Sequence, residues 1–201
     1  MTPLPVSPRP RPQPPYSPIP PPPDPFAAHH GITLEAELGV GIVYISDPQR
    51  AGLTLFDGPD PSITTPPSLA GIDLAIGGFI TPRLALTVRA SDVDVTSIDA
   101  RLSGATITAV IGPALQYWLT PAWWLGAGGG AALFTFTKSK CSVSNSCFTG
   151  WGLDARLGYT FIKSGKLSIN VAAEVTPAFY SSLDATWNAT GFALVFGYQY
   201  L

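Results

Sequence analysis

The C-terminal ten residues, 192–201, alternate between large apolar side chains and small or polar ones. The large set is Phe192, Leu194, Phe196, Tyr198 and Tyr200, and the other set is Ala193, Val195, Gly197 and Gln199. Successive side chains of a β-strand point to opposite faces, so this pattern predicts a strand with one bulky apolar face. Such a face at the end of a chain is typical of a strand whose outer side meets lipid.

The same alternation recurs upstream and predicts eight strands. They span residues 32–45, 69–80, 84–93, 103–118, 123–136, 151–161, 166–178 and 188–201. In the first strand, the apolar set is Ile32, Leu34, Ala36, Leu38, Val40, Ile42 and Tyr44. The second and fourth segments alternate less cleanly, and the Gly-rich fifth is predicted mainly from its length and flanks. Pro113, in the fourth segment, removes a ladder hydrogen bond, so we expect a β-bulge there.

The connections between these strands are short and long in turn. Those after the second, fourth and sixth strands are tight and centre on residues 81–83, 120–122 and 163–165. Those after the odd-numbered strands are long and polar, and the first runs from 47 to about 68. Transmembrane barrels have an even strand count, short periplasmic turns and longer outer loops. The pattern therefore predicts an all-β, eight-stranded antiparallel up-and-down transmembrane β-barrel with both termini in the periplasm.

Aromatic residues gather near the predicted strand ends in two bands. The band near the short turns comprises Phe79, Tyr117, Trp118, Trp123, Trp124, Tyr159, Phe161, Tyr198 and Tyr200. The band near the long connections comprises Tyr44, Phe134, Phe136, Phe148, Trp151, Phe179, Tyr180 and Trp187. Amphipathic rings favour the headgroup level of a bilayer, so we interpret the bands as interfacial girdles.

On this pattern, turn placement and aromatic C-terminal strand, residues 32–201 resemble the small outer-membrane barrels of the OmpA/OmpX type. The resemblance implies a structural or surface-interaction role and insertion by the barrel-assembly machinery, which reads a C-terminal aromatic residue. Here Tyr200 is penultimate and Leu201 follows it, so this signal departs from the family pattern.

Composition supports a membrane location. Only 12% of residues are charged, about half the usual share in soluble proteins. The formal net charge of −2 gives no electrostatic reason to expect nucleic acid as a partner. The charge-free stretch 102–137 raises the alternative of two membrane helices. Pro113, the glycines of 126–130 and apolar segments shorter than the ~20 residues of a spanning helix argue against it.

Residues 1–30 form a separate Pro-rich tail, and residues 31–201 form the predicted barrel domain. The first 25 residues include 13 prolines, which predict an extended polyproline II spacer that could reach roughly 75 Å into the periplasm. Arg9 and Arg11 raise the alternative of recognition by a periplasmic partner. No apolar signal-peptide segment follows Met1, so either the numbering starts near a mature chain or the start is misassigned.

Cys141 and Cys147 flank a Ser/Asn-rich segment in the third long connection. A lone pair at this spacing favours a loop-closing disulfide in an oxidising compartment. Two free thiols are the alternative. No third and fourth ligands lie nearby, so no metal site is expected.

The polar face of the strands carries few charges, which are the candidate site residues. They are Glu35, Glu37, Asp73, Arg89, Asp154, Arg156 and Glu174. Reflection of strands about their turns places residue 75 opposite Arg89, and Glu174 opposite Asp154. An eight-stranded barrel is just wide enough for side chains, so we expect an ion-pair and hydrogen-bond network that fills the lumen. The excess of acids raises the alternative of a narrow, cation-preferring pore.

Two further classes are weighed. Catalysis of the Ser-His-Asp kind needs a histidine beside the nucleophile, and His29 and His30 precede the first strand, which we expect to place them outside the barrel. A soluble, lipocalin-like barrel that binds a hydrophobic ligand would carry many charges on its outer face, but the polar face here is mostly Gly, Ala, Thr and Ser. We predict a non-enzymatic outer-membrane protein without a cofactor, whose long loops face outward and whose partners are lipid, the assembly machinery and a periplasmic partner of the tail.

Overall fold

The structure is a computed structural model that describes residues 24–27, 29–46, 62–64, 67–96, 105–136, 147–181 and 186–201. Within these ranges the chain forms strands joined by turns. The strands are β1 (Ile32–Ser46), β2 (Ser62–Thr64), β3 (Ser68–Thr81), β4 (Leu84–Thr96), β5 (Ala105–Trp118), β6 (Trp123–Phe136), β7 (Cys147–Ser164), β8 (Leu167–Ser181) and β9 (Thr186–Tyr200). No helix in the described part is long and apolar enough to cross a membrane.

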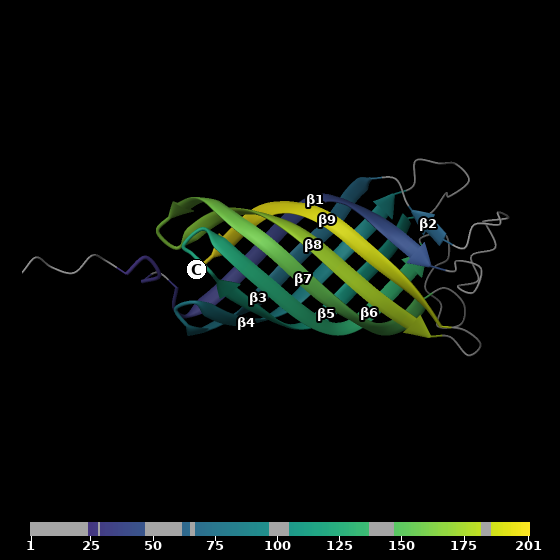
Figure 1. The fold of residues 1–201 in the computed structure, drawn as a ribbon, viewed down its shortest axis with the longest axis horizontal. Coiled ribbons are helices and arrows are strands. Elements are labelled where there is room, and N and C mark those ends of the chain that lie inside the picture. Colours follow the sequence, from purple (N-terminus) through teal and green to yellow (C-terminus); the bar gives the residue numbers. More distant parts are fainter. Residues whose placement is uncertain are drawn as a thin grey trace, which may run out of the picture.

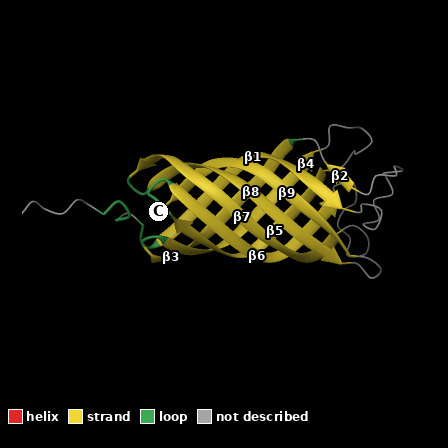
Figure 2. Cartoon of the chain, in the orientation of Figure 1, coloured by secondary structure: helices red, strands yellow, loops and turns green. Residues whose placement is uncertain are grey.

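Eight of these strands form a closed antiparallel barrel (Figures 1 and 2). Each of β3 to β8 pairs with the next strand in the chain, and β1 closes the ring by pairing with both β3 and β9. This confirms the predicted all-β barrel and its eight strands. The short strand β2 was not predicted. It lies in the first long connection and pairs with Tyr44–Ser46 at the end of β1.

The three short turns lie at one end of the barrel, with the segment before β1 and the C-terminus (Figure 1). Two turns fall where the Pro-containing tripeptides predict them. The third is one residue later than expected, at Gly165–Lys166, because β7 continues to Ser164. Gly165 has a φ of +60°, a left-handed conformation that glycine adopts without steric cost.

Bulky apolar side chains point outward along every barrel strand. On β1 and β9 they are Ile32, Leu34, Leu38, Val40, Tyr44, Phe192, Leu194, Phe196, Tyr198 and Tyr200. The alternate positions, whose side chains point inward, are buried. Glu37, for example, is 1% exposed, whereas its neighbour Leu38 is 59% exposed. Burial thus follows the period of two that the sequence predicts, with the greasy face outside.

The β-bulge expected at Pro113 is absent. Ile111 pairs with Ala131 and Ala114 with Gly128, so the register is the same on both sides of the proline and no bulge forms. Pairing with β6 is simply interrupted at 112–113, which is where a missing N–H removes a hydrogen bond. The register shifts occur instead at Leu38/Gly39, Phe79/Thr81 and Thr160/Ile162.

Six residues of the predicted aromatic bands pack inside the barrel, not in lipid-facing girdles. Trp118, Trp124, Phe134, Tyr180 and Trp187 are buried, and Phe79 is half-buried against Trp118. The reason is parity, because the adjacent aromatics Tyr117/Trp118, Trp123/Trp124 and Phe179/Tyr180 must face opposite sides of their strands. The outward members of these pairs, and Trp151, remain exposed.

Several expectations lie outside the described residues. They concern the Pro-rich chain before Asp24, most of the connection 47–68, and Cys141 with its proposed disulfide. The backbone of Cys147 begins β7, but its side chain is not described.

Candidate functional site

The interior of the barrel is divided into layers along its axis. An aromatic layer at the turn end contains Trp118 and Trp124. An aromatic layer at the loop end contains Phe134, Tyr180 and Trp187. Between them lie a charged layer and, toward the turns, a layer of amides and hydroxyls. Inward positions of tilted strands meet at common levels, which produces such layering in small barrels.

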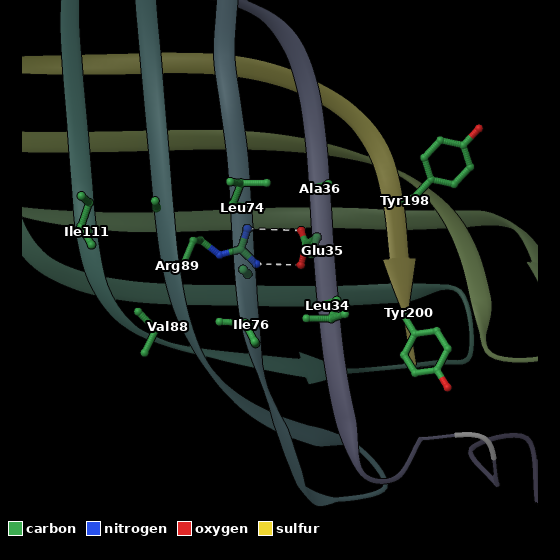
Figure 3. Close-up of a pocket in the computed structure, with 12 residues that line it drawn as sticks. Leu34, Glu35, Ala36, Leu74, Ile76, Val88, Arg89, Ile111, Tyr198 and Tyr200 are labelled. Atoms are coloured by element: carbon green, nitrogen blue, oxygen red, sulfur yellow. Dashed lines mark hydrogen bonds and ion pairs between the residues drawn. The ribbon is translucent and has the colours of Figure 1, made fainter.

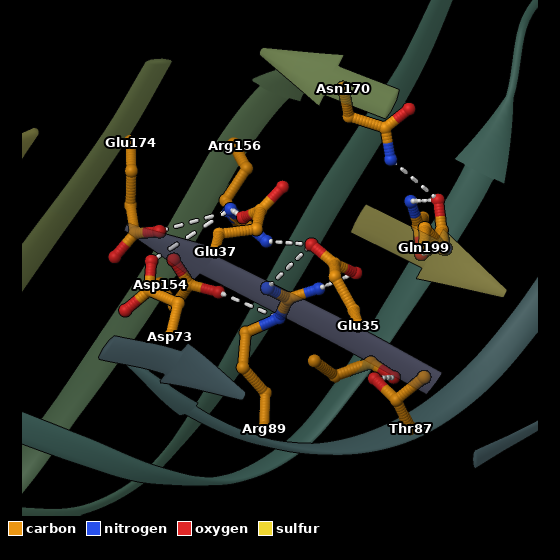
Figure 4. A network of polar contacts seen from close by, with 12 residues as sticks. Glu35, Glu37, Asp73, Thr87, Arg89, Asp154, Arg156, Asn170, Glu174 and Gln199 are labelled. Carbon is orange, nitrogen blue, oxygen red and sulfur yellow. Dashed lines mark hydrogen bonds and ion pairs between the residues drawn. The ribbon is translucent and has the colours of Figure 1, made fainter. Parts of the chain in front are cut away.

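All seven charged residues expected on the inner face lie within the barrel, each 5% exposed or less. They come from five strands. Glu35 and Glu37 are on β1, Asp73 is on β3, Arg89 is on β4, Asp154 and Arg156 are on β7, and Glu174 is on β8. Figure 4 shows the seven side chains converging across the lumen.

Arg156 is the hub of this network. Its Nη1 donates to Glu35 Oε1 at 2.7 Å, and its Nε lies 2.9 Å from Glu174 Oε2. Its Nη2 donates to Glu37 Oε2 and lies 3.9 Å from Asp73 Oδ2. One guanidinium therefore ties β7 to β1, β3 and β8, and its side chain is fully buried.

Arg89 is a second, smaller hub. Its two terminal nitrogens donate to the two carboxylate oxygens of Glu35 at 3.2 and 2.9 Å, a bidentate arrangement of the stronger kind. Its Nε lies 3.8 Å from Asp154 Oδ2. Glu35 thus bridges both arginines. Five carboxyl groups and two guanidiniums share the layer, so every arginine has several acidic neighbours.

Figure 3 shows the Arg89–Glu35 pair among the residues that line a hollow in the barrel wall. On its outer side a shallow apolar hollow is lined by Leu34, Leu74, Ile76, Val88 and Tyr200, among others. The small side chains Ala36, Ala75 and Ala90 also line it. The strands therefore separate an ion pair from an apolar exterior by one layer of backbone.

The strand registers explain which pairs form. Residue 75 pairs with Arg89, as expected. The expected pairing of Glu174 with Asp154 is wrong, because Glu174 lies opposite Arg156. Reflection about Ser164 placed the turn too early and left out the extra residue at Phe161. Together these two differences shift the register by two residues, so the same face of β8 stays inward. The error therefore replaces an acid–acid pair by an ion pair.

The sequence placed Gln199 on the polar face of its strand and predicted hydrogen bonds in the lumen, but it did not predict a separate amide layer. Gln199 Nε2 donates to Gln116 Oε1 at 2.8 Å, and Asn170 Nδ2 donates to Gln199 Oε1 at 3.0 Å. Thr160 Oγ1 donates to Asn170 Oδ1 at 2.7 Å. Each of these residues has the inward parity of its strand, so parity applied to uncharged polar residues would have identified them.

Trp124 contacts the charged layer from the turn end of the barrel. The centre of the Arg156 guanidinium lies 5.4 Å from an indole ring centroid of Trp124, a cation–π distance. Trp124 is opposite Gly158, and a Cβ at Gly158 would lie 2.0 Å from Trp124 Cζ2. Gly158 therefore creates the space for the indole inside the barrel.

The expectation that His29 lies outside the barrel is wrong. The residue is 2% exposed at the turn-end mouth, where its Nδ1 lies 3.0 Å from the carbonyl oxygen of Pro82. Its Nε2 lies 3.1 Å from Lys163 Nζ. The atoms that face its two ring nitrogens are a backbone carbonyl oxygen and a lysine nitrogen, not the hydroxyl and carboxylate of a Ser-His-Asp arrangement, so this geometry gives no positive evidence of catalysis. Among the described residues, no group of His, Cys, Asp and Glu is arranged to hold a metal ion.

No protein-family model matches the chain, and no curated protein matches it. Among solved structures, it is similar to Neisserial surface protein A, with 13% identity, 85% of this chain and 98% of that chain covered, and a TM-score of 0.52. Ail, the attachment invasion locus protein of Yersinia pestis, matches with 14% identity, 84% and 98% coverage and a TM-score of 0.47. The outer membrane protein OprG from Pseudomonas aeruginosa matches with 17% identity, 86% and 96% coverage and a TM-score of 0.42.

The similarity to Neisserial surface protein A concerns the fold. It confirms the expected resemblance to small outer-membrane barrels: this chain has the eight-stranded, closed antiparallel fold of that class.

Proposed function

We propose that this protein is an outer-membrane barrel with a sealed interior, which serves as a rigid scaffold for surface interactions of its long connections. One observation carries the proposal: the outer face is apolar along every barrel strand, while the charged residues are gathered inside and tied across the lumen. Burying greasy side chains inside and charges outside would suit a soluble lipocalin-like barrel. The arrangement here is the reverse and suits contact with lipid hydrocarbon.

Filling of the lumen favours the scaffold over the cation-preferring pore. Aromatic layers close the charged layer at both ends. A cavity beside Arg89, Ser91 and Asp154 measures about 10 Å³, which is close to the least volume that holds a single water. Ion passage would require the guanidinium ties to break, and the acidic excess instead serves to satisfy two arginines from several strands.

The proposal includes an orientation and partners. The turn end, with both the segment before β1 and the C-terminus, faces the periplasm, and the long connections, 47–68 and 138–150 above all, face outward. The outer face contacts membrane lipid, and the barrel-assembly machinery inserts the chain. Tyr200 points outward while Leu201 is buried at the mouth, so Tyr200 is the outward aromatic that ends the last strand. The Pro-rich tail extends into the periplasm and offers a partner a binding segment there.

Planar-bilayer recording tests the sealed interior. Protein that shows heat-modifiable mobility in detergent gels, and is therefore folded, is added to the bilayer. We expect no reproducible unitary conductance. Such a conductance in the native protein, reduced in Glu37→Gln, would refute the scaffold and support the pore. A band that runs at one position boiled and unboiled would count against a membrane barrel altogether.

A further inference from the structure

The residues just before β1 fold into the turn-end mouth of the barrel. Asp24, Phe26, Ala27 and His29 form a short turn, in which Ala27 N donates to Asp24 O at 3.1 Å and His29 N donates to Phe26 O at 2.8 Å. Gly31 then redirects the chain into β1 with a φ of +83°, a conformation that suits glycine. Figure 1 shows this purple segment at the same end as the C-terminus.

Two side chains of this segment, Phe26 and His29, enter the mouth. Phe26 is 4% exposed and packs in the aromatic layer with Trp118 and Leu201. The Arg83 guanidinium lies 4.4 Å from the Phe26 ring centroid. The His29 ring lies 4.8 Å from the Trp118 ring and 5.3 Å from the Phe79 ring, centroid to centroid. We call residues 24–31 the mouth segment.

The contacts of His29 require a neutral ring. The carbonyl of Pro82 can only accept a hydrogen bond, so Nδ1 carries the proton and donates to it. Nε2 is then the unprotonated nitrogen and accepts from the Lys163 ammonium. Protonation would place an N–H opposite the ammonium, so the bond to Lys163 would be replaced by a repulsion between two cations.

Charged groups of both signs lie around the mouth segment. Lys163 comes from the end of β7 and Arg83 from the β3–β4 turn, and both are cations. Asp24, on the mouth segment itself, is the facing carboxylate. Burial, followed by Lys163, lowers the pKa of His29 from 6.5 to about 4, against the smaller raising effects of the Pro82 hydrogen bond and Asp24.

We propose that the mouth segment is a plug that closes the turn end of the barrel, and that protonation of His29 releases the plug. His29 is thus a positioning residue that makes docking of the mouth segment depend on pH. The inference stands on the contacts at the mouth and holds whether or not the barrel serves as a surface scaffold.

Hydrogen–deuterium exchange of the folded protein in detergent micelles tests the plug. At pH 7.5 we expect the amides of Phe26, Ala27 and His29 to be protected, because each donates a hydrogen bond within the mouth segment. A histidine whose pKa falls from 6.5 to about 4 on docking weakens docking as pH falls below 6.5. Protection, corrected for intrinsic exchange, should therefore drop by about 30-fold between pH 7.5 and pH 5, while the strands keep theirs.

Four variants separate the parts of the proposal. His29→Gln retains a donor and an acceptor but cannot take up a proton, so the segment should stay protected at pH 5. His30→Gln alters the exposed neighbouring histidine and should behave as the native chain. Lys163→Met should reduce the 30-fold drop. Phe26→Ala should remove protection of the segment at pH 7.5 without exposing the strands.

Three results would overturn the inference. Exchange of the native segment at free-chain rates at pH 7.5 would show that there is no plug. Equal loss of protection at pH 5 in His29→Gln and the native chain would show that another group is the proton sensor. Abolition of the pH dependence by His30→Gln would show that His30, and not His29, is the proton sensor. None of these depends on conductance, so failure here is distinct from failure of the scaffold proposal.

Discussion

Replacement of Arg156 by methionine tests the central tie of the barrel. Methionine retains much of the length of the side chain but removes the charge and all five N–H donors. The Arg156 side chain is fully buried and serves Glu35, Glu37, Asp73 and Glu174. Arg89 still holds Glu35, but Glu37 and Glu174 lose their nearest cation.

The magnitude follows from this uncompensated charge. Removal of one partner from a buried ion pair costs about 3–5 kcal/mol, because the remaining charge stays desolvated. We expect R156M to lower the free energy of unfolding by that amount. R89M should cost less, since Arg89 serves two carboxylates and Glu35 keeps its hydrogen bond from Arg156. R156M combined with Glu174→Gln should recover part of the loss.

Urea unfolding in lipid vesicles, followed by tryptophan fluorescence and gel mobility, measures these energies. Lys166→Met is the matched control, because it removes one cation from an exposed turn, where a surface change is worth within about 0.5 kcal/mol. If R156M costs no more than Lys166→Met, the network does not hold the strands together. A double variant no more stable than R156M would show that the carboxylates are compensated in another way.

Two further predictions concern the wall of the barrel. Gly158→Ala should destabilise the barrel by about 1–3 kcal/mol, because the new Cβ would meet Trp124 at 2.0 Å. Gly126→Ala should be tolerated, since its Cβ would meet nothing nearer than 3.5 Å. Urea unfolding and the near-ultraviolet circular dichroism of the tryptophans check both variants, and equal effects would contradict the packing. Ala155→Arg, on the outward face near the middle of β7, should cost about 2–4 kcal/mol and Thr149→Arg, near its loop end, about 0–1 kcal/mol; vesicle unfolding that shows no dependence on depth would contradict lipid contact.

The sequence alone predicted the strands, their faces and the class of fold. Alternation with a period of two is a local property, so the segments and the two faces of each clearly alternating strand could be predicted without knowledge of their neighbours. The low charge of the polar face then indicated which face meets lipid. The short turns were predicted for the same reason, since Pro and Gly act on the residues beside them. Applied more strictly, parity would also have placed Trp118, Trp124 and Gln116 inside, because their neighbours along the strand face outward.

The partners of each inward residue were decided only by the tertiary structure. Glu35 meets Arg156 across 121 positions of sequence, and that contact exists because β1 closes the ring with β9 and the strands tilt around a common lumen. A bulge at Phe161 and a later turn set Glu174 opposite Arg156, and no local pattern announced either. The docking of Phe26 and His29 likewise needs the assembled mouth. Which face a side chain takes is settled by its own strand, whereas what it touches inside a closed barrel depends on strands that are remote in the chain.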